Sequence, residues 1–143
     1  MIFREAQVED IPALSEIRLS VTENVLSDPR KVTPEMYASY LSVSGKGWLC
    51  EVDGEAVGFS VASLRDASIW ALFVKPGYEG RGIGTRLLKL ATGWLLDMGA
   101  SRISLSTDAN TRADRVYESR GWKRGEIKSD GEVSYRLDKS GRT

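Results

Sequence analysis

Three glycines alternate with other residues in the segment 79–84, which reads Glu-Gly-Arg-Gly-Ile-Gly and follows an apolar run. The pattern after it predicts a helix, and the first turn of a helix has unpaired N–H groups and a partial positive charge, which suit a phosphate. Glycines carry no side chain that would hold a phosphate away from these N–H groups. The segment therefore predicts a phosphate-binding loop. The alternative is a tight turn that packs the helix closely and binds nothing.

Two other phosphate-binding motifs fit this segment less well. A P-loop needs Gly-Lys-Ser/Thr, whereas Gly82 is followed by Ile83 and Gly84 by Thr85, so a P-loop is excluded. A dinucleotide-binding loop needs G-x-G-x-x-G with an acidic residue about 20 positions further on. Asp108 lies at a suitable distance, but the glycine spacing here is G-x-G-x-G. Dinucleotide binding stays open as an alternative.

Histidine, the side chain used most often as a general base, is absent from the 143 residues. Acid and base roles therefore fall to Glu, Asp, Tyr, Lys, Cys or water. Cys50 is the single cysteine, which excludes an internal disulfide, and its place in an apolar strand favours a core residue. Because the commonest metal ligand is missing, we expect no metal.

Strand and helix patterns surround the glycine loop and must position it. Apolar alternation or continuous apolar runs predict strands over 2–6, 48–52, 56–64, 68–74 and 101–107, with a last hairpin turning at Asp130-Gly131. Apolar spacings of three and four predict helices over 11–25, after Thr33-Pro34, over 83–98 and over 111–119. Gly45 and Gly47 are expected to end the second helix.

The run 68–74 has the pattern of a central strand. It is apolar at nearly every position, so both of its faces are expected to be buried. A helix and the strand 101–107 follow, which predicts that the two strands are parallel with a right-handed crossover. We therefore expect an α+β fold in one domain, residues 1–143, with a central mixed, mostly antiparallel sheet and helices on both faces.

The composition excludes several classes of partner. Twenty basic and twenty acidic residues cancel, so the net charge indicates neither a nucleic acid nor an anionic membrane as the main partner. No apolar run approaches the about 20 residues that span a bilayer, and the first residues, MIFREAQVED, lack the pattern of a secretion signal. We expect a cytoplasmic protein with no membrane partner.

Two motifs resemble the GNAT superfamily of acyl-CoA-dependent N-acetyltransferases. The segment 79–84 matches that family's Q/R-x-x-G-x-G/A motif at its glycines, although Glu79 stands where Gln or Arg is usual. A second segment, Asn110-x-x-Ala113-x-x-x-Tyr117, resembles the family's N-x-x-A-x-x-x-Y helix. The order of strands and helices is similar from end to end. The resemblance implies the GNAT fold, in which the parallel strands 68–74 and 101–107 splay apart.

The resemblance further implies an N-acetyltransferase that uses acetyl-CoA and no metal. Amides of 81–85 would bind the CoA pyrophosphate, the edge of 72–74 would pair with the pantetheine arm, and Tyr117 would be the general acid to the thiolate. The implied cofactor-binding residues are Leu72, Phe73, Val74, Glu79, Gly80, Arg81, Gly82, Ile83, Gly84, Thr85 and Asn110. We expect the Glu79 carboxylate to point away from the pyrophosphate and to contribute mainly its amide. The alternative for Tyr117 is a core tyrosine.

No single general base stands out in the sequence. The strand 68–74 contains no carboxylate, and Glu23 and Asp28 are candidates only because that region usually shapes the acceptor pocket in the family. The acceptor is an unidentified amine. A non-catalytic acyl-CoA-binding or regulatory module on the same fold is the alternative function. Many members of the family dimerise, so a homodimer is an open expectation.

Overall fold

The computed structural model describes residues 1–21 and 32–138 of the chain. Its strands are β1 (Ile2–Glu5), β2 (Gly45–Val52), β3 (Glu55–Ser63), β4 (Ser68–Val74), β5 (Arg102–Asp108), β6 (Lys123–Ile127) and β7 (Glu132–Asp138). Its helices are the 3-10 turn η1 (Val8–Asp10), α1 (Ile11–Ser20), α2 (Pro34–Ser42), α3 (Ile83–Asp97) and α4 (Arg112–Ser119). None of these described helices is long and apolar enough to cross a membrane.

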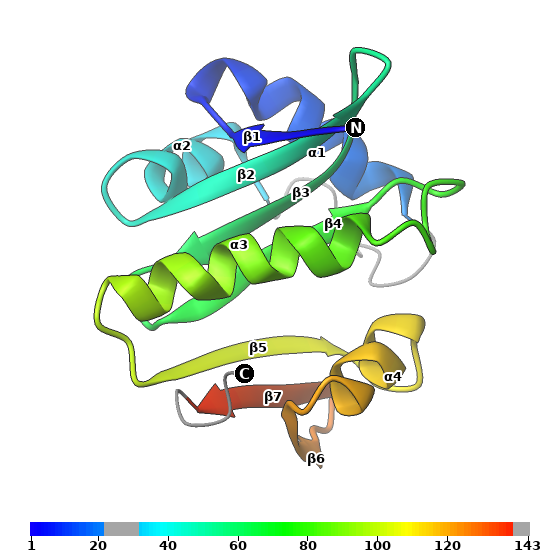
Figure 1. Cartoon of the computed structure of the whole chain (residues 1–143). Helices are drawn as coiled ribbons and strands as arrows, with labels where there is room; N and C mark the ends of the chain where they lie inside the picture. Colours follow the sequence, from blue (N-terminus) through cyan, green and yellow to red (C-terminus); the bar gives the residue numbers. More distant parts are fainter. Residues whose placement is uncertain (22–31, 139–143) are drawn as a thin grey trace.

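The seven strands form one mixed sheet in the order β1-β2-β3-β4-β5-β7-β6. Every neighbouring pair is antiparallel except β4 and β5, which are parallel. In Figure 1, α3 crosses one face of the sheet and α1 and α2 lie on the other. One core packs under α3 and extends to α4 and β7, and a second packs between the sheet and α1 and α2. This is the α+β architecture predicted from the sequence.

The parallel strands β4 and β5 separate soon after they meet. Their pairing is recorded at one position, Ser68 opposite Ser104, whereas β5 pairs with β7 along its whole length. On the other side of β4 the register slips, because Ala71 faces Val61 and Ile69 faces Ala62, which leaves Trp70 as a bulge. A bulge bends its strand, which explains why β4 turns away from β5. The predicted splay is confirmed.

The splay also corrects the expected burial of β4. Only Ile69 and Ala71 are buried, and the other residues of the strand are partly exposed. A strand whose neighbour departs loses the cover that a central strand usually has. The apolar run therefore marks both a core strand and the wall of an opening.

Two other expectations differ from the structure. The first helix ends at Ser20, and Val21 is already extended; the rest of its predicted range lies outside the described residues. Gly45 and Gly47 do not end α2 but begin β2, opposite Ser63 and Val61. A side chain at Gly45 would collide with the carbonyl of Ala62, and a Cβ at Gly47 would lie 2.5 Å from Leu41 Cδ2. Thr33 caps α2 as predicted, accepting a hydrogen bond from the Met36 N–H.

Gly58 on β3 sets how closely α3 approaches the sheet. A Cβ at this position would lie 3.1 Å from Ile83 Cγ2, 3.2 Å from Leu87 Cδ1 and 3.2 Å from the Phe73 carbonyl oxygen. Gly58→Ala is therefore expected to lower the free energy of unfolding by about 1–3 kcal/mol, because the site is already filled. Urea unfolding followed by circular dichroism measures this. A stability within about 0.5 kcal/mol of wild type would mean that α3 moves away at little cost.

Candidate active site

The glycine loop ends in an uncapped helix terminus. Gly82 is the N-cap of α3, with a left-handed backbone (φ 82°) that favours glycine, and no side chain caps the helix. The N–H groups of Ile83, Gly84 and Thr85 therefore have no intrahelical acceptor. Their position suits an anion, and anion binding at this terminus stays a prediction.

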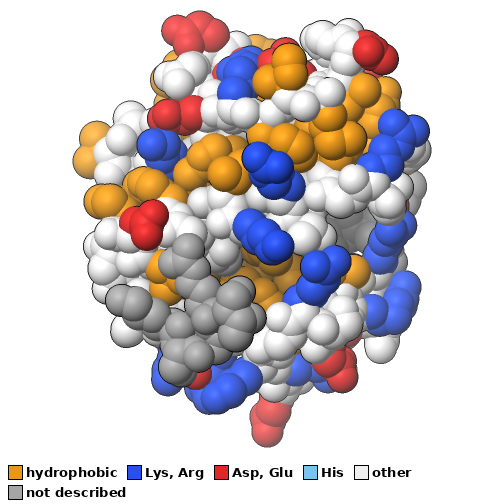
Figure 2. All heavy atoms as spheres, viewed as in Figure 1, with side chains coloured by type: hydrophobic (Ala, Val, Ile, Leu, Met, Phe, Trp, Pro, Cys, Tyr) orange, Lys and Arg blue, Asp and Glu red, His pale blue; other side chains and the backbone are white. Residues whose placement is uncertain are grey.

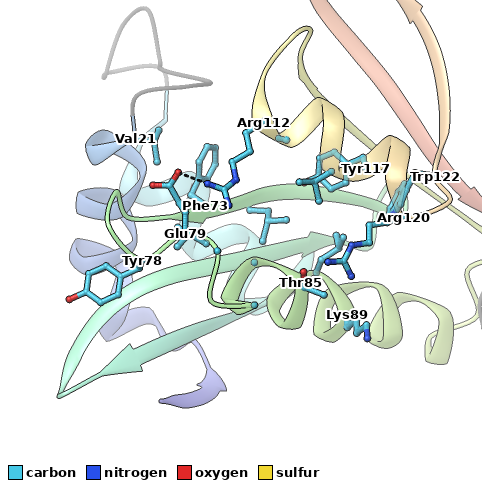
Figure 3. A pocket seen from close by; sticks show the side chains of 18 of the residues that line it. Val21, Phe73, Tyr78, Glu79, Thr85, Lys89, Arg112, Tyr117, Arg120 and Trp122 are labelled. Atoms are coloured by element: carbon cyan, nitrogen blue, oxygen red, sulfur yellow. Dashed lines mark hydrogen bonds and ion pairs between the residues drawn. The ribbon is translucent and has the colours of Figure 1, made fainter.

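A cavity of about 810 Å³, here called the α3 cavity, opens beside this terminus. Figure 3 shows it between the glycine loop, the start of α3 and helix α4. Nine of the predicted site residues line it: Leu72, Phe73, Val74, Glu79, Gly80, Gly82, Gly84, Thr85 and Tyr117. The structure therefore brings the end of β4, the loop and α4 together.

Three of the predicted site residues that the structure describes are not among those that line this cavity. The Arg81 guanidinium lies 5.1 Å from the centre of the Tyr78 ring, and the Ile83 side chain is buried in the core. Asn110 is exposed, has a left-handed backbone (φ 65°) and donates its N–H to Asp114 at 2.8 Å. Arg81 and Ile83 could therefore contribute their backbone amides, but not their side chains, to a ligand at the glycine loop.

The charge of the α3 cavity is mostly positive. Among its described lining residues, Lys89, Arg112 and Arg120 are cations and Glu79 is the carboxylate. Figure 2 shows Lys and Arg side chains spread over the face that α3 crosses, with Asp and Glu nearer its edges. This balance suits a ligand with several phosphates.

The Glu79 side chain is directed toward Arg112 of α4, and its orientation away from the pyrophosphate stays a prediction. It lines the α3 cavity, and its Oε2 lies 3.4 Å from Nη1 of Arg112 (Figure 3). Both side chains are about half exposed, at 42% and 52%, so the pair is weak. The carboxylate of Glu79 is therefore paired with Arg112, a cation on α4.

A second cavity of about 550 Å³, here called the α1 cavity, lies beside the splay of β4 and β5. Arg18 of α1 lines it, and so do the carboxylate residues Asp66, Asp108 and Glu132. The two cavities share four lining residues, namely Leu72, Phe73, Ala113 and Tyr117. They therefore meet where the two parallel strands diverge.

Tyr117 lies where the two cavities meet. Its side chain is buried, 6% exposed, and packs against the rings of Trp122 and Tyr135 with centroids 5.8 and 5.6 Å away. Burial raises the pKa of Tyr117 well above its usual range. The hydroxyl therefore keeps its proton at neutral pH, as a group that donates a proton must.

Asp114 holds the helix that carries Tyr117, and the sequence reasoning missed it. Its buried carboxylate accepts hydrogen bonds from Arg124 Nε and Nη2, both at 3.0 Å, from the Asn110 N–H and from the Tyr135 hydroxyl. The Arg124 guanidinium and these donors hold the pKa of Asp114 well below its usual range. The Thr-x-x-Asp spacing at the start of α4 is a capping signal that points to this role.

The candidate bases Glu23 and Asp28 lie outside the described residues, so they stay predictions. Arg18, Lys89, Arg112 and Arg120 also went unnoticed, since single cations on amphipathic helices carry no motif. Within the described residues, no group of three or more His, Cys, Asp or Glu side chains is placed to hold a metal ion.

The chain is similar to known N-acetyltransferases in sequence. The model of the acetyltransferase (GNAT) family matches residues 11–122. An uncharacterized N-acetyltransferase of Archaeoglobus fulgidus is 33% identical over 93 residues, which cover 58% of this chain and 63% of that protein. Aminoglycoside N(6')-acetyltransferase type 1 of Stenotrophomonas maltophilia is 28% identical over 115 residues, covering 71% of each chain.

The fold is similar to that of solved acetyltransferases. The PaiA N-acetyltransferase of Thermoplasma acidophilum, determined in complex with coenzyme A, superposes with a TM-score of 0.81 over 96% of this chain and 98% of that chain, at 17% identity. The chain spans 63% and 59% of the lengths of two curated relatives that it matches. Since the family match extends from α1 to Trp122 and includes the glycine loop and Tyr117, the chain belongs to the acetyltransferase (GNAT) family.

Proposed function

We propose that the protein transfers an acetyl group from acetyl-CoA to a primary amine, with Tyr117 as the general acid. The meeting of two cavities at Tyr117 is the observation that carries this proposal. One cavity has the charge and the helix terminus for a phosphate-rich cosubstrate, and the other has carboxylates that suit an amine. The related PaiA protein was solved with coenzyme A, which supports the choice of cosubstrate.

Acetyl-CoA would bind in the α3 cavity. The N–H groups at the start of α3 would bind its pyrophosphate, with Lys89, Arg112 and Arg120 supplying positive charge. The edge of β4 beyond Ser68 has no recorded pairing with β5, so it is open to the amide groups of the pantetheine arm. This arrangement would bring the thioester toward Tyr117.

The reaction forms a C–N bond and breaks the thioester C–S bond. The amine loses a proton to water or a base, the departing thiolate takes one from Tyr117, and Tyr117 regains a proton from solvent before the next turnover. A tyrosine with a pKa of ~10 is a weaker acid than a thiol of ~8.5, so complete transfer is uphill by roughly 2 kcal/mol even before burial. Burial raises the pKa of Tyr117 further, so we infer that its proton moves as the C–S bond breaks, not before.

The amine must reach the thioester carbon in its neutral form. At pH 7 this costs ~4.6 kcal/mol for a lysine-like amine and ~1.4 kcal/mol for an α-amine with a pKa near 8. Carboxylates of the α1 cavity, Asp66, Asp108 and Glu132, could accept the proton through water. Glu23 and Asp28 remain proposed candidates for the same role. A weakly basic amine depends least on such a base, because its deprotonation at pH 7 costs the least free energy.

The alternative is a non-catalytic module that binds acyl-CoA, favoured by the lack of a carboxylate on β4. Free thiol released from acetyl-CoA, measured with a panel of amines, separates the two functions. Release that depends on an amine supports transfer; CoA binding without release with any amine would favour the module. CoA at about 100 times its Kd should add ~2.7 kcal/mol to the free energy of unfolding and so raise the melting temperature. NAD should not raise it.

Glu79→Gln tests the departure from the family motif. We expect the Kd for CoA to fall by less than tenfold, or ~1.4 kcal/mol, because the change removes one negative charge near the phosphates. Isothermal titration measures the Kd. Glu55→Gln is the matched control, since Glu55 pairs with Lys75 at 3.7 Å and lines neither cavity. A hundredfold change would mean that the carboxylate itself governs binding.

A cytoplasmic location, a homodimer and the absence of nucleic-acid and membrane partners stay predictions. Each follows from the composition or the family resemblance. Size-exclusion chromatography with light scattering would test the dimer directly.

A further inference from the structure

Arg18 lies in an unusual place for an arginine. It projects from α1 into the lining of the α1 cavity, and its guanidinium carbon lies 4.0 Å from the centre of the Phe73 ring. Its Nε is buried and has no hydrogen-bond partner among the residues that the structure describes. A buried donor without a partner destabilises a protein, so such a group calls for an explanation.

The guanidinium remains a cation in this place. Burial lowers the pKa of Arg18, and the phenol of Tyr37 and the carboxylate of Asp108 act in the opposite direction. Because an arginine does not lose its proton in proteins, a partly desolvated positive charge stays at the wall of the cavity. An anion bound at that wall would offset the cost of its desolvation.

The position of Arg18 relates this charge to the reaction. Phe73 lines both cavities, so the guanidinium that stacks on its ring is one side chain away from the place where they meet. The carboxylates Asp66, Asp108 and Glu132 line the same α1 cavity. The cavity therefore offers a cation and several anions to one ligand.

A ligand with both charges matches this lining. An ammonium group would be attracted by the carboxylates, and an anionic group on the same molecule would bind Arg18. A polyamine would instead bring only positive charge toward Arg18, at a cost of like-charge repulsion. Arg18 would also favour the neutral form of a nearby amine, which is the form that reacts.

We propose that the acceptor is a small amino acid or a similar molecule, an amine that carries a carboxylate, and that Arg18 binds the carboxylate. This rests on the proposed acetyl transfer. It narrows the acceptor from any primary amine to one with a carboxylate close to the reacting nitrogen, and it makes Arg18 a specificity-determining residue.

Matched pairs of acceptors test the proposal on the wild-type protein. The panel holds the common amino acids and the amines that their decarboxylation yields, with thiol release from acetyl-CoA as the readout. We expect the best amino acid to exceed its decarboxylated amine in kcat/KM by at least tenfold. Equal or better transfer to the decarboxylated amines would overturn the inference and leave the proposed function intact.

Variants of Arg18 add a second readout. Arg18→Gln should raise KM for the best amino acid at least tenfold, change KM for decarboxylated amines by a much smaller factor, and be partly rescued by Arg18→Lys. The matched control is Arg86→Gln, because Arg86 also stacks on an aromatic ring, 5.0 Å from the centre of Phe3, but lines neither cavity. An equal loss with both kinds of acceptor would contradict the proposal, since it would indicate a structural role.

A measurement of amino-acid binding tests the role of Arg18 independently of acetyl transfer. If no amine releases thiol, the proposed function fails, and the same panel is then titrated calorimetrically into the protein with CoA present. Binding of an amino acid that is lost in Arg18→Gln would support the carboxylate site even so. No binding of any amino acid to wild type, or binding that Arg18→Gln leaves unchanged, would overturn it.

Discussion

Tyr117→Phe is expected to lower kcat by roughly 100-fold or more and to leave the Kd for acetyl-CoA nearly unchanged. The substitution keeps the ring that packs on Trp122 and Tyr135 and removes only the hydroxyl. In the proposed function, acetyl-CoA binding would depend mostly on the glycine loop and the cations of the α3 cavity. The step that loses its proton donor is the departure of the thiolate.

The structure strengthens the reason for this large effect. Tyr117 is the one tyrosine, among the described residues, that lines both cavities, and in the proposed function its hydroxyl would lie between the thioester and the amine. Its raised pKa keeps the proton in place until negative charge develops on sulfur. Without the hydroxyl, a water molecule would have to enter this buried position and donate the proton.

Stopped-flow or steady-state thiol release gives kcat, and isothermal titration gives the Kd. Tyr40→Phe is the control, because it removes a hydroxyl from a tyrosine that stacks on Trp70 and lines neither cavity. An unchanged kcat in Tyr117→Phe would remove the residue from the mechanism and return it to the role of a core tyrosine.

Asp114→Asn is expected to lower the free energy of unfolding by roughly 2–3 kcal/mol. The change breaks the charged pairing with Arg124 and leaves an amide among donors that were directed at a carboxylate. Since Asp114 precedes Tyr117 by one turn of α4, transfer should decline with stability. Urea unfolding measures the first effect and thiol release the second.

The same carboxylate predicts how stability depends on pH. The folded protein holds the pKa of Asp114 below the value of about 3.9 in the unfolded chain. Its contribution is therefore complete above about pH 5 and decreases as the pH falls through about 4 toward the folded pKa. Unfolding at several pH values should show a difference between wild type and Asp114→Asn that shrinks on acidification.

Asp138→Asn is the matched control for this prediction. Asp138 pairs with Arg102 at 2.9 Å and Lys123 at 3.4 Å, but both cations are well exposed, so its loss should cost much less stability than the loss of Asp114. Equal losses for the two variants, or a difference that grows on acidification, would contradict the role of Asp114 in holding α4.

Most of the fold was predictable because its signals are local. The apolar run of β4, the glycine loop and the stripe of α3 specify a parallel unit, and Asp53-Gly54 and Asp130-Gly131 mark hairpins. The bulge at Trp70 was not predictable, because it depends on how two strands match in register. The same holds for Gly45, whose need for glycine arises from the carbonyl of a neighbouring strand.

The candidate site was predictable where a motif covers it and not elsewhere. The loop and Tyr117 came from patterns, whereas Arg18, Arg112 and Asp114 act through partners far along the chain. Glu79 shows the limit most clearly. Its departure from the family motif was visible in the sequence. The cation that pairs with its carboxylate, Arg112, lies 33 positions away on α4, so the sequence did not indicate this contact.

The most direct test of the account is the mass of the acceptor after incubation with the protein and acetyl-CoA. The account predicts that an amine gains one acetyl group on nitrogen and that one free thiol appears for each acetyl group transferred. Acetyl-CoA that binds in the α3 cavity and stays intact with every amine, with no acetylated product, would contradict it.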